Sequence, residues 1–126
     1  PRVSPPLPVG PIDELAIEGV ACADGATVLD LHATRGARIQ LRGAAASGKT
    51  DLLRMLVRLM DPQQGRITVN GRDLRDVDLA GLRARVALVS TSLGLKRGTI
   101  RRLVTLRRPR ATAEQIDAVL QRCHLT

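Results

Sequence analysis

The sequence has no phenylalanine, tyrosine or tryptophan among its 126 residues. The hydrophobic core must therefore be built from leucine, valine, isoleucine and alanine, and no base or sugar can stack on an aromatic ring of this chain. Cysteine is almost as scarce, with Cys22 and Cys123 as the two examples. These two residues lie far apart in the sequence and lack the close spacing that is typical of a metal site. We expect both cysteines to be reduced thiols in a reducing compartment.

Long hydrophobic runs are also missing. The most apolar stretch, residues 52–60, is interrupted by Arg54 and Arg58, whereas about 20 apolar residues are needed to cross a bilayer. Residues 1–11 contain no apolar run that would act as a secretory signal. We therefore expect neither a membrane span nor an export signal in this sequence.

Acidic residues are outnumbered, and the formal net charge is +8, with lysine only at positions 49 and 96. Three interpretations remain open. The arginine, alanine and glycine content is typical of a GC-rich genome; the charge could form a surface for nucleic acid or an anionic membrane; or acidic partner segments lie outside this chain. Because 44% of residues are hydrophobic, a packed core is expected and wholesale disorder is not.

The order of apolar runs and breaks predicts one α/β domain after a linker. Five of the seven prolines fall within the first 11 residues, so residues 1–12 are predicted to be an extended linker and residues 13–126 the folded part. Apolar patterning predicts strands and helices in alternation. The expected strands are 15–20, 27–31, 38–42, 66–69 and 86–89, and the expected helices are 49–60, 79–85, 99–106 and 113–123.

Local signals refine these elements. Residues 15–31 are expected to form a hairpin, and Asn70-Gly71 is a tight-turn signal. Asp78 can cap the following helix, and Thr112 with Gln115 three residues later is a capping box.

The strongest motif is G-x-x-x-x-G-K-[ST], which lies between a predicted strand and a predicted helix. Its glycines let the backbone curl so that N–H groups point at phosphate oxygens, and the helix adds its positive N-terminal end. Lys49 would neutralise the β- and γ-phosphates of a nucleoside triphosphate, and the Thr50 hydroxyl would be a ligand of Mg²⁺. The predicted nucleotide site comprises Gly43, Ala44, Ala45, Ala46, Ser47, Gly48, Lys49, Thr50 and Asp51.

A catalytic carboxylate is harder to find. Triphosphate hydrolysis needs a second acidic group that organises Mg²⁺, usually at the end of an apolar strand. The strand at 86–89 ends in Ser90, and the strand at 66–69 ends in Asn70. Asp30 lies before the loop, where we expect a turn or strand-end role. We therefore assign no catalytic residue.

From Ile17 onward, the chain resembles the first half of an ATP-binding cassette domain, the motor of ABC transporters, of exporter type. The resemblance covers about 110 residues and extends well beyond the phosphate loop. It is carried by residues 52–56, the Asp61-Pro62 break, Gly65 before a strand, the 69–74 hairpin, residues 98–101 and residues 111–125.

This resemblance implies a P-loop NTPase-like fold: a partial cassette core with an N-terminal β hairpin and the start of the helical subdomain. It also implies ATP and Mg²⁺ as ligands, ATPase activity, and partners in the form of a transporter's transmembrane domain and a second cassette. Residues 1–12 would join the membrane domain to the cassette, and the expected location is the cytoplasmic face of the inner (plasma) membrane.

Several positions depart from the family pattern. Ala46 stands where the family usually has glycine, and Ala45 stands where it has serine or asparagine. The glutamine that contacts Mg²⁺ aligns with Thr91, which is too short to replace it. The aromatic residue that stacks on adenine falls near residues 22–24, where no ring exists. Because stacking on a base is worth about 1–3 kcal/mol, its loss would weaken affinity roughly ten- to hundred-fold.

The chain also stops before the family's signature motif, second acidic motif and switch histidine, and His124 is a helix-end residue rather than that histidine. The chain is therefore expected to be either a fragment of a longer transporter or a decayed cassette, with negligible ATP hydrolysis on its own. The alternatives are a non-catalytic regulatory or scaffolding cassette and an arginine-rich nucleic-acid-binding module.

The nucleic-acid alternative depends on a basic stretch without acidic residues. It could be a solvated surface, a contact with a coupling helix or anionic lipid headgroups, or a nucleic-acid surface. No nucleic-acid partner is expected, because no aromatic platform is interleaved with the charge. The stretch contains Lys96, Arg97, Arg101, Arg102, Arg107, Arg108 and Arg110.

Overall fold

The computed structural model describes residues 5–21, 25, 27–91 and 97–125. The chain divides into two compact units, Pro1–Val89 and Ser90–Thr126, and each is considered by itself. Both sheet and helices are present, which confirms the α/β class expected from the sequence. Within the described ranges, no helix has the length and apolar character needed to cross a membrane.

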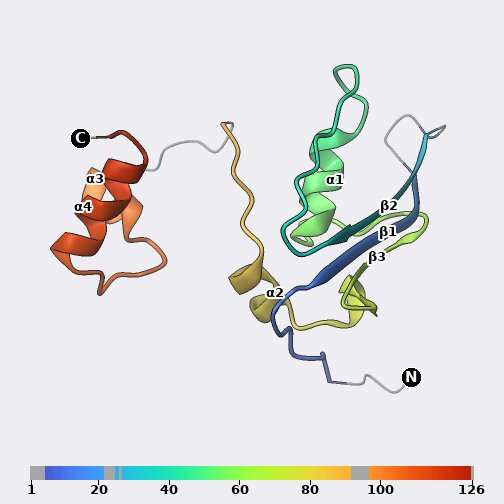
Figure 1. The fold of residues 1–126 in the computed structure, drawn as a ribbon, viewed down its shortest axis with the longest axis horizontal. Helices are drawn as coiled ribbons and strands as arrows, with labels where there is room; N and C mark the ends of the chain where they lie inside the picture. Colours follow the sequence, from blue (N-terminus) through green and yellow to red (C-terminus); the bar gives the residue numbers. More distant parts are fainter. Residues whose placement is uncertain (1–4, 22–24, 26, 92–96, 126) are drawn as a thin grey trace. The chain divides into compact units, whose positions relative to one another are not determined.

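The first unit is built on a four-stranded sheet in the order β2-β1-β3-β4 (Figure 1). The strands are β1 (Glu14–Ala21), β2 (Val28–Thr34), β3 (Arg66–Val69) and β4 (Arg72–Asp73), and every neighbouring pair is antiparallel. The pairing of β1 with β2 confirms the expected N-terminal hairpin.

The turn between β3 and β4 is the predicted Asn70-Gly71 turn, with φ of 49° and 75°. The Asn70 amide oxygen also accepts hydrogen bonds from the backbone N–H groups of Asp13 and Glu14, at 2.9 and 3.1 Å. This turn therefore also fixes the chain where it enters β1.

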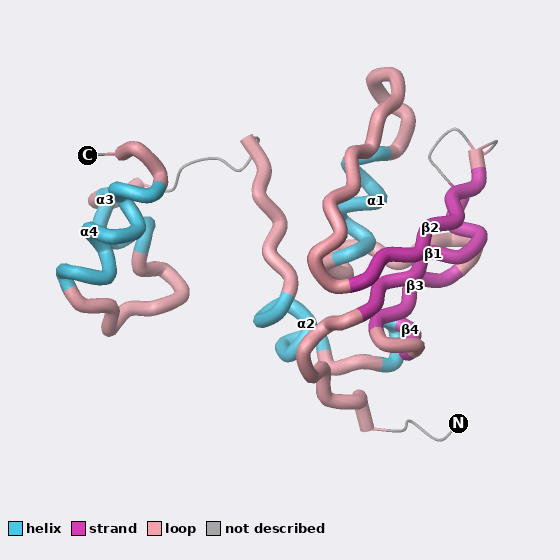
Figure 2. Tube along the Cα trace, in the orientation of Figure 1, coloured by secondary structure: helices cyan, strands magenta, loops and turns pink. Residues whose placement is uncertain are grey.

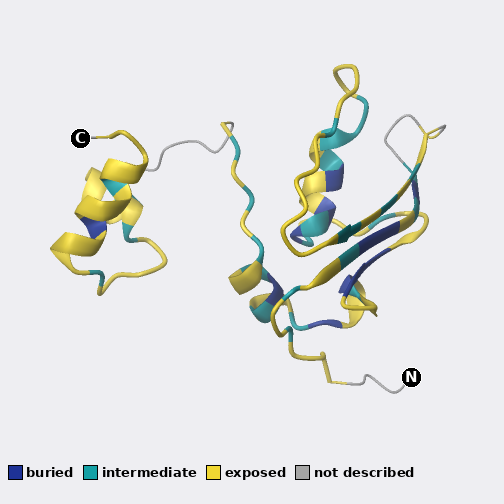
Figure 3. Ribbon diagram, viewed as in Figure 1, coloured by how far each residue is buried: buried dark blue, intermediate teal, exposed yellow. Residues whose placement is uncertain are grey.

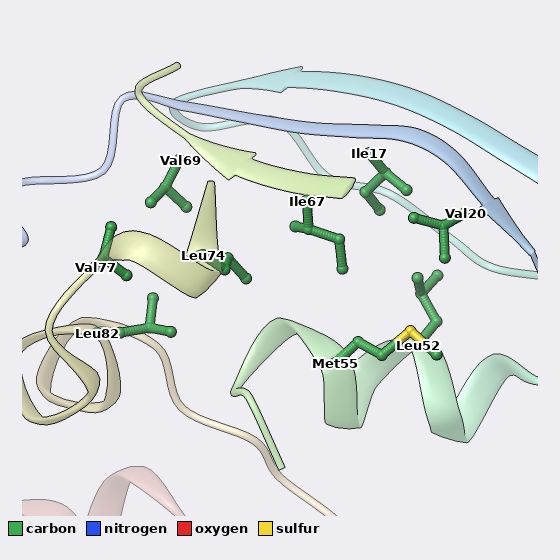
Figure 4. Close-up of a cluster of buried hydrophobic side chains, with 9 residues drawn as sticks. All are labelled: Ile17, Val20, Leu52, Met55, Ile67, Val69, Leu74, Val77 and Leu82. Carbon is green, nitrogen blue, oxygen red and sulfur yellow. The ribbon is translucent and has the colours of Figure 1, made fainter. Parts of the chain in front are cut away.

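Helix α1 (Lys49–Leu56) covers one face of this sheet. Figure 4 shows Leu52 and Met55 of α1 directed toward Ile17, Val20 and Ile67 of the strands. Figure 3 shows the same buried stripe along β1, β3 and the inner side of α1. Because aliphatic groups fill this layer, the core forms without aromatic residues, and it places the first turn of α1 beside the sheet.

Helix α1 ends at Leu56, earlier than the predicted residue 60. Arg58 adopts a left-handed conformation with φ of 49°. The Arg83 guanidinium of α2 (Leu79–Arg85) donates to the carbonyl oxygens of Val57 and Arg58, at 3.1 and 2.8 Å. A cation from another element therefore caps the C-terminal end of α1. The predicted Asp78 cap of α2 is present, through a bond from the Gly81 N–H.

Two predicted strands, residues 38–42 and 86–89, are not strands in the structure (Figure 2). A strand needs a neighbour that completes its backbone hydrogen bonds. Within the described part of the chain, no strand pairs with either segment. Val89 is 91% exposed. Both segments have the apolar residues expected of a strand, but neither has the neighbouring strand that it would pair with among the described residues.

The described part of the proline-rich segment, residues 5–12, contacts the first unit. Leu7 forms a parallel bridge with Val77, and its N–H donates to the Asp76 carbonyl oxygen at 2.9 Å. Val9 and Ile12 pack against the core of the first unit. The segment next to the predicted boundary at residue 12 thus contributes to the packing of the sheet unit.

The second unit contains α3 (Ile100–Val104) and α4 (Ala113–Arg122). The capping box of Thr112 and Gln115 is present as predicted. Helix α3 is shorter than expected, because the chain leaves helical geometry at Thr105. Among the described residues of this unit only Ile116 is buried (Figure 3).

Candidate functional site

The predicted phosphate loop lies immediately before α1, at the N-terminal end of that helix (Figure 1). The Lys49 side chain turns back over the loop. Its Nζ atom donates to the carbonyl oxygens of Gly43 and Ala44, at 2.7 and 2.5 Å, and to Ser47 Oγ at 3.0 Å. Three neutral oxygens thus hold the ammonium group within the curl of the loop.

Two glycines permit this curl. A Cβ atom at Gly43 would lie 2.8 Å from Ser47 Oγ and 3.7 Å from Lys49 Nζ, so a side chain there would fill the space that the ammonium group approaches. Gly48 precedes the helix with φ of 89°, a conformation that a side chain disfavours.

Ala46 occupies the left-handed region, with φ of 62°. An L-residue with a Cβ atom loses roughly 1–2 kcal/mol in this conformation. The sequence comparison with the family raised this position because glycine is usual there, and the dihedral angle shows why glycine is favoured. The loop therefore forms its curl with local backbone strain.

Thr50 and Asp51 lie in the first turn of α1. Thr50 is exposed, and Asp51 Oδ1 forms an ion pair with the Arg54 guanidinium at 3.1 Å. Asp51 brings a negative charge to the positive end of the helix, which stabilises the helix.

Two hollows adjoin the loop and share Gly48 and Leu52. The hollow on the Lys49 side has a volume of about 230 Å³ and is lined by Thr27, Leu29, Leu41, Arg42, Gly43, Ser47, Gly48, Lys49 and Leu52. The other has a volume of about 370 Å³ and is lined by Val20, Ala21, Gly25, Gly48, Asp51, Leu52, Met55, Met60, Gln63 and Gln64. The first is basic on one side, and the second combines aliphatic groups, thioethers, two amides and the Asp51 carboxylate.

Three other sequence expectations have different outcomes. Asp30 accepts a hydrogen bond from the Gly19 N–H at 2.7 Å, beside the irregularity in β1. Its role is structural, though it lies within β2 rather than at a strand end. Thr91 is exposed in the second unit. The position of the missing aromatic residue, at residues 22–24, is outside the described residues.

Sequence reasoning missed some lining residues. Arg42 lines the same hollow as Lys49 and directly precedes the loop, so its position next to Gly43 was an available signal. Met60, Gln63 and Gln64 line the other hollow from the turn after α1. The sequence did not indicate that this turn lies beside Gly48. The predicted helix extended to residue 60, so Met60 was expected to lie within the helix and not in a turn.

The loop geometry fits a phosphate group. It combines an ammonium group, the positive end of a helix and a curl at Gly43 that a side chain would fill. The donor set for Mg²⁺ within the loop is the Thr50 hydroxyl, which suits an ion that takes most of its ligands from phosphates and water. The chemistry that the arrangement supports is binding of a phosphorylated anion.

Comparison with known proteins identifies the family of the chain. The family model described as ABC transporter matches residues 26–126. The chain is 34% identical over 97 residues to the mitochondrial iron-sulfur clusters transporter ATM1 of Gibberella zeae, covering 77% of this chain and 14% of that protein. It is 33% identical over 112 residues to the ATP-dependent lipid A-core flippase of Neisseria meningitidis, covering 89% of this chain and 18% of the flippase.

The structure is similar to that of a bacterial Atm1-family ABC exporter with ATP bound. The TM-score is 0.82 at 25% sequence identity, over 94% of this chain and 22% of the exporter chain. The chain spans less than a fifth of the length of the two curated relatives named above. The family match over residues 26–126 and the shared fold both lead to one assignment. The chain belongs to the ABC transporter family.

Proposed function

We propose that residues 13–126 are part of the ATP-binding cassette of an exporter, and that residues 43–50 bind the triphosphate of ATP. The observation that carries this proposal is the position of Lys49 Nζ, which is within 3.0 Å of Ser47 Oγ and two loop carbonyl oxygens. Among the described residues, the hydrogen-bond acceptors of this ammonium group are neutral oxygens, so a bound phosphate would supply its counter-charge.

In the proposed complex, Lys49 exchanges carbonyl contacts for phosphate oxygens, and backbone N–H groups at the start of α1 donate to the same anion. Thr50 contributes its hydroxyl oxygen to Mg²⁺. The metal ion, when bound, neutralises phosphate charge and fixes the orientation of the triphosphate. Arg42, in the hollow beside Lys49, adds a second positive charge.

We place the nucleoside in the hollow of about 370 Å³ on the other side of Gly48. Its volume lies in the range of small-molecule sites, which are mainly apolar with a few polar groups. Met55 and Met60 provide polarizable contacts for a base, and Gln63 and Gln64 provide amide donors and acceptors. Because this chain has no aromatic ring, the base is bound without ring stacking and the affinity is low.

The wider assembly is proposed from the relatives. ATM1 is a transporter by name and the other relative is an ATP-dependent flippase by name. We propose a transmembrane domain and a second cassette as partners of this chain. The corresponding location is the cytoplasmic face of the inner membrane. ATP binding would then be coupled to transport through contacts with that transmembrane domain.

The proposal is tested by titrating the chain with fluorescent ATP and Mg²⁺. Substituting Lys49→Ala removes a charge-assisted contact worth about 1.5–3 kcal/mol, so affinity is expected to fall roughly ten- to hundred-fold. Lys96→Ala, which removes the other lysine, is the matched control and should keep the wild-type affinity. Equal affinity in the wild-type and Lys49→Ala proteins would show that the loop is not the site.

A further inference from the structure

One residue of β1 lies outside the regular pairing of the sheet. The register between β1 and β2 joins Ile17 to Leu31 and then Val20 to Leu29. From one pair to the next, β1 advances by three residues (17 to 20) and β2 by two (31 to 29), so β1 contains one extra residue. Gly19 lies in this interval with φ of 62°, and β1 therefore has a β-bulge at Gly19.

The bulge decides which way the Val20 side chain points. Side chains alternate between the two faces of a regular strand, so residues three positions apart would lie on opposite faces. Because the bulge adds one residue, Ile17 and Val20 share the face toward α1, and Figure 4 shows both directed toward Leu52 and Met55. Val20 and Ala21 also line the larger hollow, of about 370 Å³. The bulge thus brings one wall of that hollow into place.

Asp30 of β2 holds the bulge in its conformation. Its Oδ1 atom accepts a hydrogen bond from the Gly19 N–H at 2.7 Å. Among the described strand pairs, Gly19 is outside the register of β1 with β2 and also outside that of β1 with β3, which ends at Glu18. The Asp30 carboxylate therefore supplies the acceptor that this N–H does not obtain from a neighbouring strand.

The same bulge contacts the opposite wall of the hollow. Gly65 lies so close to the bulge that a Cβ atom on it would be 2.3 Å from the carbonyl oxygens of Glu18 and Gly19. Gln63 and Gln64, immediately before Gly65, line the hollow. Since close-packed backbone cannot shift independently, both walls of the hollow depend on the path of β1 at Gly19.

We propose that Asp30 is a positioning residue for the nucleoside of ATP and acts through the Gly19 N–H. Asp30 is not among the described lining residues of either hollow, so its effect is on the shape of the larger one. This inference rests on the proposed function, which places the nucleoside in that hollow and the triphosphate at residues 43–50. Asp30 therefore governs what the nucleoside adds to the affinity and leaves the contribution of the triphosphate unchanged.

Calorimetric titration of the full chain with ATP and with inorganic tripolyphosphate, each with Mg²⁺, tests this proposal. Because tripolyphosphate has no base or sugar, the ratio of the two affinities isolates the contribution of the nucleoside. Asp30→Ala removes the acceptor and should lower the ATP affinity, and with it this ratio, by about three- to tenfold. Its affinity for tripolyphosphate should stay at the wild-type value. Asp30→Asn keeps an oxygen acceptor and should retain most of the wild-type ratio.

Asp13→Ala is the matched control. Asp13 is an exposed aspartate before the first residue of β1, and its carboxylate pairs with Arg35 at 3.5 Å. The control therefore removes one carboxylate from the same strand region without touching the bulge, and its ratio should equal that of the wild-type chain. An unchanged ratio in Asp30→Ala would overturn the proposal. Equal losses for ATP and tripolyphosphate would also overturn it, because they would indicate general damage to the fold.

Failure of the proposed function gives a different result. In that case the wild-type chain would bind neither ligand, or Lys49→Ala would bind tripolyphosphate as well as the wild-type chain does. Either result overturns this inference together with the proposed function. Lys49-dependent binding of both ligands, combined with an unchanged ratio in Asp30→Ala, overturns only the role of Asp30.

Discussion

Ala46 is the residue at which the loop departs most clearly from relaxed geometry, with φ of 62°. Substituting Ala46→Gly removes a strain of about 1–2 kcal/mol, while the extra freedom of glycine in the unfolded chain costs about 0.5–1 kcal/mol. We expect a net gain of up to about 1.5 kcal/mol in the free energy of unfolding. The measurement is urea denaturation of both proteins.

The neighbouring Ala45 provides the control. Within the described ranges, the non-glycine residues with positive φ include Ala46 but not Ala45. Ala45→Gly should therefore lower the free energy of unfolding by about 0.5–1 kcal/mol, since it adds only chain entropy. Opposite signs for the two variants support strain at Ala46, and a loss in both would contradict it.

Residue identities in the site could be predicted, but their conformations could not. The motif located Gly43, Lys49 and Thr50 because their spacing is fixed by the loop chemistry. The positive φ of Ala46 follows from the curl of the whole loop. The identity of residue 46 alone does not predict this conformation. The pairing of Asp51 with Arg54 follows from helical spacing and could have been anticipated.

At the level of elements, the end of α1 depends on Arg83 of α2. Its guanidinium bonds to the carbonyl oxygens of Val57 and Arg58. Arg83→Ala leaves these acceptors without a charged donor, so we expect the free energy of unfolding to fall by about 1.5–3 kcal/mol. Urea denaturation measures the loss, and amide hydrogen exchange should show faster opening of the last turn of α1.

Arg85→Ala, on the same helix, is the control for this prediction. Arg85 is exposed, so its removal should change the free energy of unfolding by no more than about 0.5 kcal/mol. Similar losses in the Arg83 and Arg85 variants would indicate that the cap contributes nothing and that general charge removal explains the effect.

The same cap explains why the helix end was predicted too late. Residues 49–60 contain no glycine or proline, so local propensity gives no stop before Asp61-Pro62. The actual stop arises from a contact with a residue 25 positions away in the chain. The prediction of strands at residues 38–42 and 86–89 was wrong for a related reason. A strand forms only when a neighbouring strand pairs with it, and the apolar pattern of a segment does not show whether such a neighbour exists.

For the whole molecule, the hairpin, the β3–β4 turn and the caps were predictable because each has a local signature. The resemblance from Ile17 onward implied the start of a helical subdomain, but it gave no position for the division between Val89 and Ser90. The second unit buries only Ile116 among its described residues.

The chain alone is expected to hydrolyse ATP negligibly, because the apolar segments predicted as strands after the loop, residues 66–69 and 86–89, are followed by Asn70 and Ser90 rather than by a carboxylate that could organise Mg²⁺. Phosphate release measured with excess Mg²⁺ and ATP should remain far below about 1 s⁻¹, the low end of typical enzymes. Turnover near that value, abolished by Lys49→Ala, would contradict this expectation and would require a catalytic acidic group in this chain.

The most direct measurement of the central claim is the change in backbone amide NMR shifts when Mg²⁺ and ATP are added to the isotope-labelled chain. If residues 43–50 hold the triphosphate, the largest changes will be at Gly48, Lys49 and Thr50, and they will be lost in Lys49→Ala. Saturating changes confined to other residues, or unchanged loop amides at millimolar ATP, would contradict the account.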